Sequence, residues 1–293
     1  MPTFDGVSRT GRRRTTTLLG IAALLSSCVH APPPQPREEP PADAQLVTFP
    51  AADGARLHGF LYLPKGAGPF PAVLWNHGSE KWPGWHPELA AFYTANGFAF
   101  FIPHRRGQGR SSDAGAYIMD RQPSKFQFAV NGTEAGKTVI ALHEEASQDV
   151  AAAVAWLRAR PEIDPGRVVM SGVSFGGIQT LLAAEKGLGV RAFAAFAPGA
   201  MSWRWVKGLD GRLEQAIAHA QAPMLIVQAQ NDFSLSPSQV LGPLLERQHK
   251  GRAAVFPAFG DTEQEGHGGF ARRRQGAAIW GPTVLEFFRS ALP

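Results

Sequence analysis

Short apolar runs alternate with segments of helical periodicity from about residue 45 onward. Apolar runs of this kind, bounded by turn residues, are typical of buried strands. We predict strands at 45–49, 56–63, 71–75, 98–102, 167–171, 190–196, 224–228 and 253–256. Helices are predicted at 86–96, 146–158, 175–185, 236–248 and 282–290. This alternation predicts the α/β class, with a mainly parallel central sheet flanked by helices.

The helix at 146–158 has the clearest pattern, because Val150, Val154 and Leu157 share one of its faces. Asp113–Thr138, in contrast, has little periodicity. Long segments without secondary structure are commonly functional loops. We therefore expect a surface loop or a lid over 113–138.

The first residues have the layout of an export signal. Arg12, Arg13 and Arg14 precede an apolar run, Leu18–Leu25, which is too short to span a membrane as a helix. Leu25-Ser26-Ser27-Cys28 resembles a bacterial lipoprotein signal, which implies a signal peptide at 1–27 and lipidation of Cys28. An ordinary cleaved signal and twin-arginine export are the alternatives.

Residues 28–44 are predicted to tether a catalytic domain at 45–293 to that lipid. The stretch at 31–41, APPPQPREEPP, is too rich in proline to pack and is typical of a semi-rigid linker. We expect an exported protein, lipid-anchored on the periplasmic side of the bacterial cell envelope. The choice between the inner and the outer membrane stays open.

Charge and cysteine content narrow the functional classes. The formal net charge is +5, but residues 1–27 hold four arginines and one aspartate, and 25 basic and 23 acidic residues remain without them. No basic run is interleaved with aromatic residues, so nucleic-acid binding is not expected. The single cysteine excludes an intrachain disulfide and a cysteine-based metal site. No metal or organic cofactor is expected.

A strand-to-helix turn carries the strongest chemical signal. Gly172-Val173-Ser174-Phe175-Gly176 matches G-x-S-x-G, the nucleophile elbow, between an apolar strand and a predicted helix. The turn holds serine in a strained backbone conformation at the carboxyl edge of the sheet. Ser174 is therefore the predicted nucleophile, although a plain glycine turn has the same local pattern.

A serine hydroxyl needs a base, and this elbow occurs with the chain order serine, acid, histidine. His267 in Gly266-His267-Gly268-Gly269 follows the last predicted strand, on what we expect to be a flexible loop. His249, at a helix end, is predicted to be a surface residue. Asp232 follows the strand at 224–228 and is the predicted acid. Asp261, Glu263 and Glu265, on the loop of the histidine, rank second.

The oxyanion of the reaction needs two backbone N–H donors. Phe175 supplies the first, as the residue after the nucleophile. The second is expected from the loop after the strand at 71–75, where Ser79 is preferred and Glu80 is the runner-up. His77 would brace this loop and not act as the base.

Three further segments carry a family resemblance. Arg106–Ser111 has the pattern R-G-x-G-x-S, Asp149–Leu157 reads DVAAAVAWL, and the elbow reads GVSFGG. Together they resemble the dienelactone hydrolase-like and prolyl-oligopeptidase-like branches of the α/β-hydrolase superfamily, which implies the α/β-hydrolase fold across 45–293. Serine stands where the founding dienelactone hydrolases use cysteine, so dienelactone itself is not the implied substrate.

Substrate contacts are harder to assign from sequence. Arg105 and Arg106 could bind a substrate carboxylate, or brace loops. Trp82 could line an apolar subsite with the other tryptophans near the same loops, or all of them could pack in the core or rim. The other tryptophans are Trp85, Trp203 and Trp205.

These residues predict a serine carboxylesterase that works through an acyl-enzyme, with a small-molecule ester as substrate. A small serine peptidase that acts on short peptides or aminoacyl groups is the alternative. A non-catalytic envelope binding module is the candidate from another class. The oligomeric state stays open.

Overall fold

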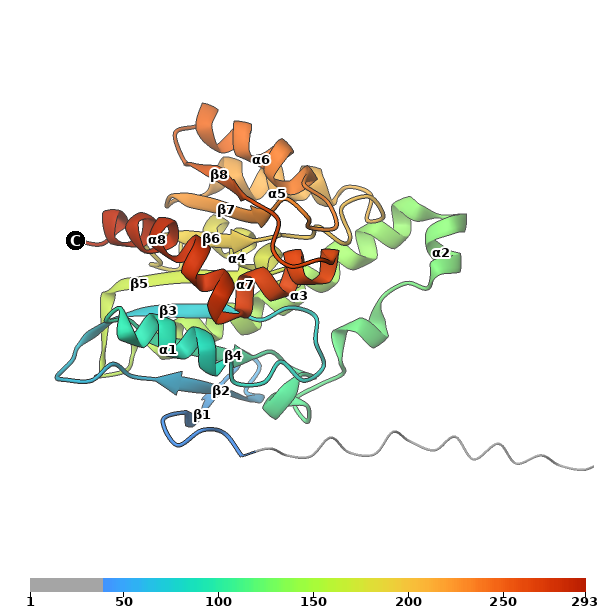
Figure 1. The fold of residues 1–293 in the computed structure, drawn as a ribbon. Helices are drawn as coiled ribbons and strands as arrows, with labels where there is room; N and C mark the ends of the chain where they lie inside the picture. Colours follow the sequence, from blue (N-terminus) through green and yellow to red (C-terminus); the bar gives the residue numbers. More distant parts are fainter. Residues whose placement is uncertain (1–38) are drawn as a thin grey trace, which may run out of the picture. The chain divides into compact units, whose positions relative to one another are not determined.

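One sheet of eight strands forms the centre of the part of the chain that the structure, a computed structural model, describes, which is residues 39–293 (Figure 1). The predicted signal peptide and Cys28 lie outside these residues. The strands are β1 (Gln45–Pro50), β2 (Arg56–Tyr62), β3 (Phe70–Asn76), β4 (Ala99–His104), β5 (Ile163–Val173), β6 (Phe193–Phe196), β7 (Met224–Ala229) and β8 (Gly251–Phe256).

The strand order is β1-β2-β4-β3-β5-β6-β7-β8. Pairing is antiparallel on both sides of β2 and parallel from β4 to β8. The predicted mainly parallel sheet is confirmed. Parallel strands need crossover connections, and helices supply them here. They are α1 (Pro87–Ala95), α2 (Lys125–Val130), α3 (Gly132–Arg158), α4 (Phe175–Glu185), α5 (Leu209–His219) and α6 (Ser236–Arg247), whereas α7 (Phe270–Arg272) and α8 (Arg274–Ala291) follow the last strand.

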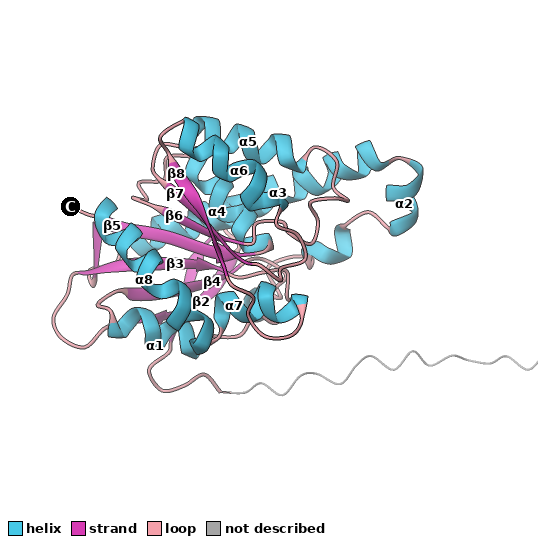
Figure 2. Ribbon diagram, turned by 45° about the horizontal axis from the view of Figure 1, so that its top comes forward, coloured by secondary structure: helices cyan, strands magenta, loops and turns pink. Residues whose placement is uncertain are grey.

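Helices cover both faces of the sheet, as Figure 2 shows. Alternate residues of β3 point to opposite faces, so Leu74 belongs to one core and Trp75 to the other. The core around Leu74 also holds apolar residues of α3, α4, α5 and α6, whereas the core around Trp75 holds those of α1, α7 and α8. This burial on two faces explains the continuous apolar runs of the strands.

The segment expected to be a loop or a lid is largely helical. It contains a 3₁₀ turn at Ile118–Arg121, all of α2 and the first residues of α3, which begins at Gly132 and not near residue 146. Ser124 caps α2 through a hydrogen bond from Gln127 N, and Asn131 caps α3 through one from Glu134 N. Figure 1 shows α2 and the start of α3 projecting past the end of the sheet. These caps explain the helices where apolar periodicity is weak.

The strand register brings four loops to one edge of the sheet. Asn76 pairs with Gly172, Val173 with Phe196, and Phe196 with Val227. The carboxyl ends of β3, β5, β6 and β7 are therefore neighbours, and ligands of open parallel sheets bind outside such ends. Among the described helices, none is both long and apolar enough to cross a membrane.

Candidate active site

Ser174 occupies the turn between β5 and α4 with φ 58° and ψ −117°. A positive φ is uncommon for a residue with a side chain and is held in place by surrounding contacts. Here Ser174 N donates to Phe196 O at 2.9 Å, and Ser174 O accepts from Ile178 N at 3.1 Å. The side chain is partly exposed. The turn therefore presents a hydroxyl at the carboxyl edge of the sheet, beside the N-terminus of α4.

The glycines of the elbow are required by close backbone approach. A Cβ at Gly176 would overlap the carbonyl oxygen of Asn76, at the end of the neighbouring strand. A Cβ at Gly172 would lie 2.6 Å from Asn76 Cβ. The predicted elbow thus has a structural cause: the ends of β5 and α4 pack against Asn76 of β3 without room for side chains at these positions.

Asp232 and His267 lie together, as the chain order predicted. His267 Nδ1 is 2.8 Å from Asp232 Oδ1, and the two side chains are 4% and 0% exposed. Because a carboxylate only accepts, Nδ1 carries the proton and leaves Nε2 as an acceptor in the neutral ring. Nε2 is buried and has no hydrogen-bond partner among residues 39–293. The pair is therefore arranged to take up a proton at Nε2.

The turn that holds His267 differs from the expected flexible loop. Glu265–Gly269 form a π-helical turn in which His267 is buried. Asn231, next to Asp232, donates to Phe259 O and to Thr262 O at 3.0 Å each, and accepts from Phe259 N at 2.8 Å. These bonds join the loop of the acid to the loop of the histidine.

Sequence reasoning missed the residues that orient this pair, which are Gln228, Ser238 and the backbone amide of Phe233. Gln228 Nε2 donates to Asp232 Oδ2 at 2.7 Å, and Ser238 Oγ donates to Gln228 Oε1 at 2.7 Å. Phe233 N donates to Asp232 Oδ1 at 2.8 Å. The sequence did hold one signal for Gln228: it is a polar residue in the apolar strand β7, and a buried polar side chain needs a hydrogen-bond partner.

The loop after β3 approaches the same edge. His77 is fully buried, and burial together with the nearby Arg105 cation holds its pKa well below the usual range, so it stays neutral. Ser79 is partly exposed, and its carbonyl accepts from Tyr117 Oη. Phe175 is the first residue of α4, and its N–H therefore has no carbonyl partner within the helix.

Neither arginine stands free to bind a substrate carboxylate. Arg105 is 3% exposed, and its guanidinium binds carbonyls of the loop after β3. Arg106 forms ion pairs with Asp149 and Asp53 at 2.7 and 2.8 Å, which raise its pKa. Both arginines therefore brace loops, which was the alternative to binding a substrate carboxylate.

The tryptophans do not form one cluster. Trp82 is 52% exposed on the loop between β3 and α1, and Trp205 is 72% exposed. Trp85 and Trp203 pack against the cores on opposite faces of the sheet. A shared subsite of all four, like the role of Trp82 alone, stays a prediction.

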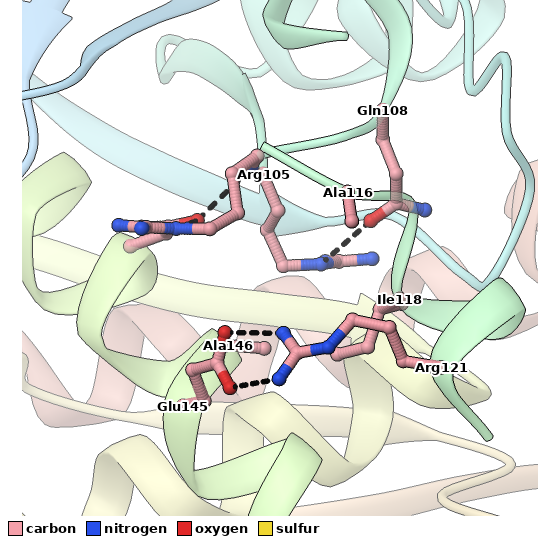
Figure 3. A pocket seen from close by; sticks show the side chains of 9 residues that line it. Arg105, Gln108, Ala116, Ile118, Arg121, Glu145 and Ala146 are labelled. Atoms are coloured by element: carbon pink, nitrogen blue, oxygen red, sulfur yellow. Dashed lines mark hydrogen bonds and ion pairs between the residues drawn. The ribbon is translucent and has the colours of Figure 1, made fainter. Parts of the chain in front are cut away.

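A small cavity lies beside Arg105 (Figure 3). Its volume is about 10 Å³, which is about the room of one water molecule. Its lining includes Gln108, Ile118 and Ala146 but not Ser174, Asp232 or His267. The cavity is therefore too small and misplaced to be the substrate pocket. The described residues also contain no group of three or more metal-ligating side chains.

Comparison with known proteins assigns the chain to a family. A family model described as acetyl xylan esterase (AXE1) matches residues 35–211. The chain belongs to this family. The matched range of the acetyl xylan esterase family includes Ser174 and the loop after β3, and ends before Asp232 and His267. No curated protein matches the chain in sequence.

Solved structures show the fold of this acetyl xylan esterase family member more widely. An acylaminoacyl peptidase from Pyrococcus horikoshii is 17% identical with a TM-score of 0.62, and the match covers 85% of this chain and 42% of that one. A candidate dienelactone hydrolase from Klebsiella pneumoniae is 18% identical with a TM-score of 0.58, covering 84% and 98%. The 2,6-dihydroxy-pseudo-oxynicotine hydrolase is 14% identical with a TM-score of 0.54, covering 85% and 68%. The predicted α/β-hydrolase fold is confirmed, and the chain is a hydrolase; it spans less than half of the peptidase.

Proposed function

We propose that this protein is a serine carboxylesterase with Ser174, His267 and Asp232 as its catalytic triad. Ser174 Oγ attacks the ester carbonyl carbon while His267 Nε2 takes its proton, and the departing alcohol then receives that proton. The product is an acyl-Ser174 ester. His267 next takes a proton from water, whose oxygen attacks the acyl carbon. The bond from that carbon to Ser174 Oγ then breaks, Oγ takes the proton back from His267 Nε2, and the acid is released. Asp232 stabilises the imidazolium in both steps.

The observation that carries this proposal is the buried Asp232–His267 pair at the same edge of the sheet as a strained serine. The 2.8 Å contact fixes Nε2 as the acceptor, and Ser174 adopts φ 58° on the same sheet edge. A structural histidine of a folded core commonly uses both ring nitrogens, whereas Nε2 of His267 lacks a partner within residues 39–293. An acceptor nitrogen is the group that a serine nucleophile requires.

Two backbone amides are proposed to bind the oxyanion. Phe175 N–H lies at the N-terminus of α4, where the helix dipole favours negative charge. Ser79 N–H lies on the partly exposed loop at the end of β3, whose last residue pairs with Gly172 of the elbow. Both donors belong to backbone and are therefore held without side-chain entropy loss.

Acetyl esters of small alcohols or sugars are the substrates that we propose first. The family description names acetyl xylan as the substrate of this family. The alternative, a small serine peptidase for short peptides or aminoacyl groups, draws on structural neighbours that include a Porphyromonas gingivalis dipeptidyl peptidase 4. That likeness rests on 15% identity and on 35% of that chain, so we favour the ester.

Covalent labelling tests the mechanism directly. A fluorophosphonate should add once to the purified protein, at Ser174, and peptide mass spectrometry would locate it. The adduct should be lost in Ser174→Ala and form slowly in His267→Ala. Hydrolysis of p-nitrophenyl acetate and acetylated xylo-oligosaccharides, against aminoacyl p-nitroanilides, separates esterase from peptidase. A folded protein that gives neither an adduct nor turnover would contradict the proposal and favour the binding module.

We further propose that the mature protein is anchored by a lipid on Cys28 in the bacterial envelope. The support is the order of Arg12–Arg14, Leu18–Leu25 and Cys28 in the sequence. After expression in a bacterial host, the full chain should partition into the detergent phase of Triton X-114 and carry labelled fatty acid. Cys28→Ser should remove the label and Ser26→Thr should keep it. A labelled Cys28→Ser protein would contradict this anchor.

A further inference from the structure

Arg105 is a buried cation whose partners are two backbone carbonyls, the Gln108 side chain and the ring nitrogen Nδ1 of His77. Its Nη2 donates to His77 O at 2.9 Å and to Gly78 O at 2.6 Å. Its Nε donates to Gln108 Oε1 at 3.2 Å, a bond that Figure 3 shows. No carboxylate of residues 39–293 is hydrogen-bonded to it. Burial lowers its pKa to about 10, so the guanidinium remains charged at neutral pH.

The bond to Gly78 O fixes the direction of the Ser79 amide. Gly78 C=O and Ser79 N–H belong to one planar trans peptide, and in such a peptide the two groups point in opposite directions. When Arg105 holds the carbonyl on its side, the N–H is turned to the other side. Tyr117 Oη donates to Ser79 O, which fixes the next peptide, and Gln108 Nε2 donates to Glu80 O at 2.7 Å, which fixes the one after it. A hydrogen bond to the carbonyl also polarises the N–H of the same peptide.

The same guanidinium lies over the ring of Phe175, with its carbon 4.8 Å from the ring centroid. The ring also packs against His143, at 4.2 Å between centroids. Phe175 is the residue that carries the other proposed donor amide. One arginine therefore contacts both segments that supply the oxyanion site, the loop after β3 and the first turn of α4.

We propose that Arg105 is a positioning residue that holds the Ser79 and Phe175 amides in register for the oxyanion. This inference rests on the proposed function. Arg105 itself does not touch the substrate, since it is 3% exposed behind the loop. A planar guanidinium can bind two carbonyls and stack on a ring at once, whereas an ammonium group cannot. Lysine at this position should therefore not replace it.

Steady-state kinetics with p-nitrophenyl acetate test this role. Arg105→Lys should lower kcat by about 10- to 100-fold with KM changed less than about twofold, because misplaced donors weaken transition-state binding. The Ki of a trifluoromethyl ketone, which forms a tetrahedral oxyanion adduct on serine, should rise by a similar factor. The pH midpoint of kcat/KM should stay where it is, because His267 is not changed.

Arg160→Lys is the matched control. Arg160 also stacks on an aromatic ring, with its guanidinium carbon 5.3 Å from the Trp156 centroid, but it precedes β5 at the opposite edge of the sheet. Its kcat and Ki should equal those of the unchanged protein. Active-site titration with fluorophosphonate corrects every rate for the folded fraction. Phe175→Leu keeps the backbone amide and removes the ring, so it should lower kcat and be non-additive with Arg105→Lys.

The outcomes separate the two proposals. Active Arg105→Lys and Phe175→Leu proteins with unchanged kcat, or a loss confined to KM, would overturn the positioning role and leave the triad intact. If the protein without substitutions shows neither turnover nor a Ser174 adduct, the proposed function is wrong and this inference is wrong with it. If Arg105→Lys does not fold, Phe175→Leu and its Ki decide the result.

Discussion

Glu80 and Arg272 form an ion pair that joins the loop after β3 to the segment after His267. Arg272 Nε also donates to Gly268 O at 3.0 Å, one residue beyond the histidine. Glu80 directly follows Ser79. The pair therefore links the segment of the proposed oxyanion donor to the turn of the proposed base, from opposite ends of the described sequence.

Arg272→Gln should loosen this link. The two side chains are 27% and 35% exposed, so solvent screens their attraction and the stability cost should be small. We expect kcat for p-nitrophenyl acetate to fall by about 3- to 10-fold, equivalent to about 1 kcal/mol in the barrier. Arg273→Gln, which breaks the more exposed pair with Glu265, serves as the control. Equal kcat values in both variants would show that the link has no catalytic role.

Asp232→Asn should leave the fold intact and remove most activity. Asparagine can donate to Nδ1 and thus favour the wrong tautomer of His267, and in a serine protease triad the equivalent change lowered kcat by about 10⁴-fold. Asp261→Asn and Glu263→Gln change exposed carboxylates on the histidine loop and should keep kcat within about twofold. Steady-state assays of the three purified variants identify the acid. Strong loss in either loop variant would move the role away from Asp232.

The sheet and the elbow could be predicted because each leaves a local pattern in the sequence. Strands buried on both faces leave apolar runs, and the close approach of α4 to Asn76 demands glycine at 176. For the Asp232–His267 pair, the sequence predicted only the order of serine, acid and histidine along the chain. The 2.8 Å contact of the pair depends on Asn231, which binds the backbone of the distant Phe259, and on Gln228, which binds Asp232 Oδ2 itself.

Two features left no readable pattern. α2 has no buried residue, and Phe126 and Val130 are 75% and 68% exposed, so its helix lacks the apolar face that periodicity detects. Arg105 binds carbonyl oxygens, which every residue has, and the sequence around it is equally consistent with a surface arginine. A role that depends on backbone acceptors can be seen only in the folded structure.

Gly176→Ala should destabilise the protein through the elbow. The new Cβ would overlap Asn76 O, and overpacking of this kind costs about 1–3 kcal/mol or more. Gly211→Ala, in α5, is the matched control because a Cβ there meets nothing within 4 Å. It should stabilise by about 0.5–1 kcal/mol through helix propensity. Urea denaturation measures both free energies of unfolding; similar values for the two variants would contradict the packing argument.

Buried neutral histidines should make the fold sensitive to acid. Burial lowers the pKa of His143 and His86 to about 3 and of His104 to about 4, and His77 is lowered as well. The unfolded chain takes up protons near the ordinary pKa of about 6.5. Below that pH the unfolded state binds more protons than the folded state does. The free energy of unfolding is therefore at its full value above about pH 6.5 and decreases as pH falls toward 4.

Replacing one of these histidines should reduce, by up to one, the number of protons that the chain takes up when it unfolds in acid. His143 is a suitable site, because its ring packs on Phe175, its Nδ1 accepts from Gln179 Nε2, and it forms no hydrogen bond with Asp232 or His267. In His143→Gln, the slope of unfolding free energy against pH between about 6 and 5 should be smaller by up to about 1.4 kcal/mol per pH unit. Urea titrations at several pH values measure the slope, and His219→Gln, an exposed histidine, should leave it unchanged. Parallel slopes for His143→Gln and the unchanged protein would mean that His143 titrates alike in the folded and unfolded states.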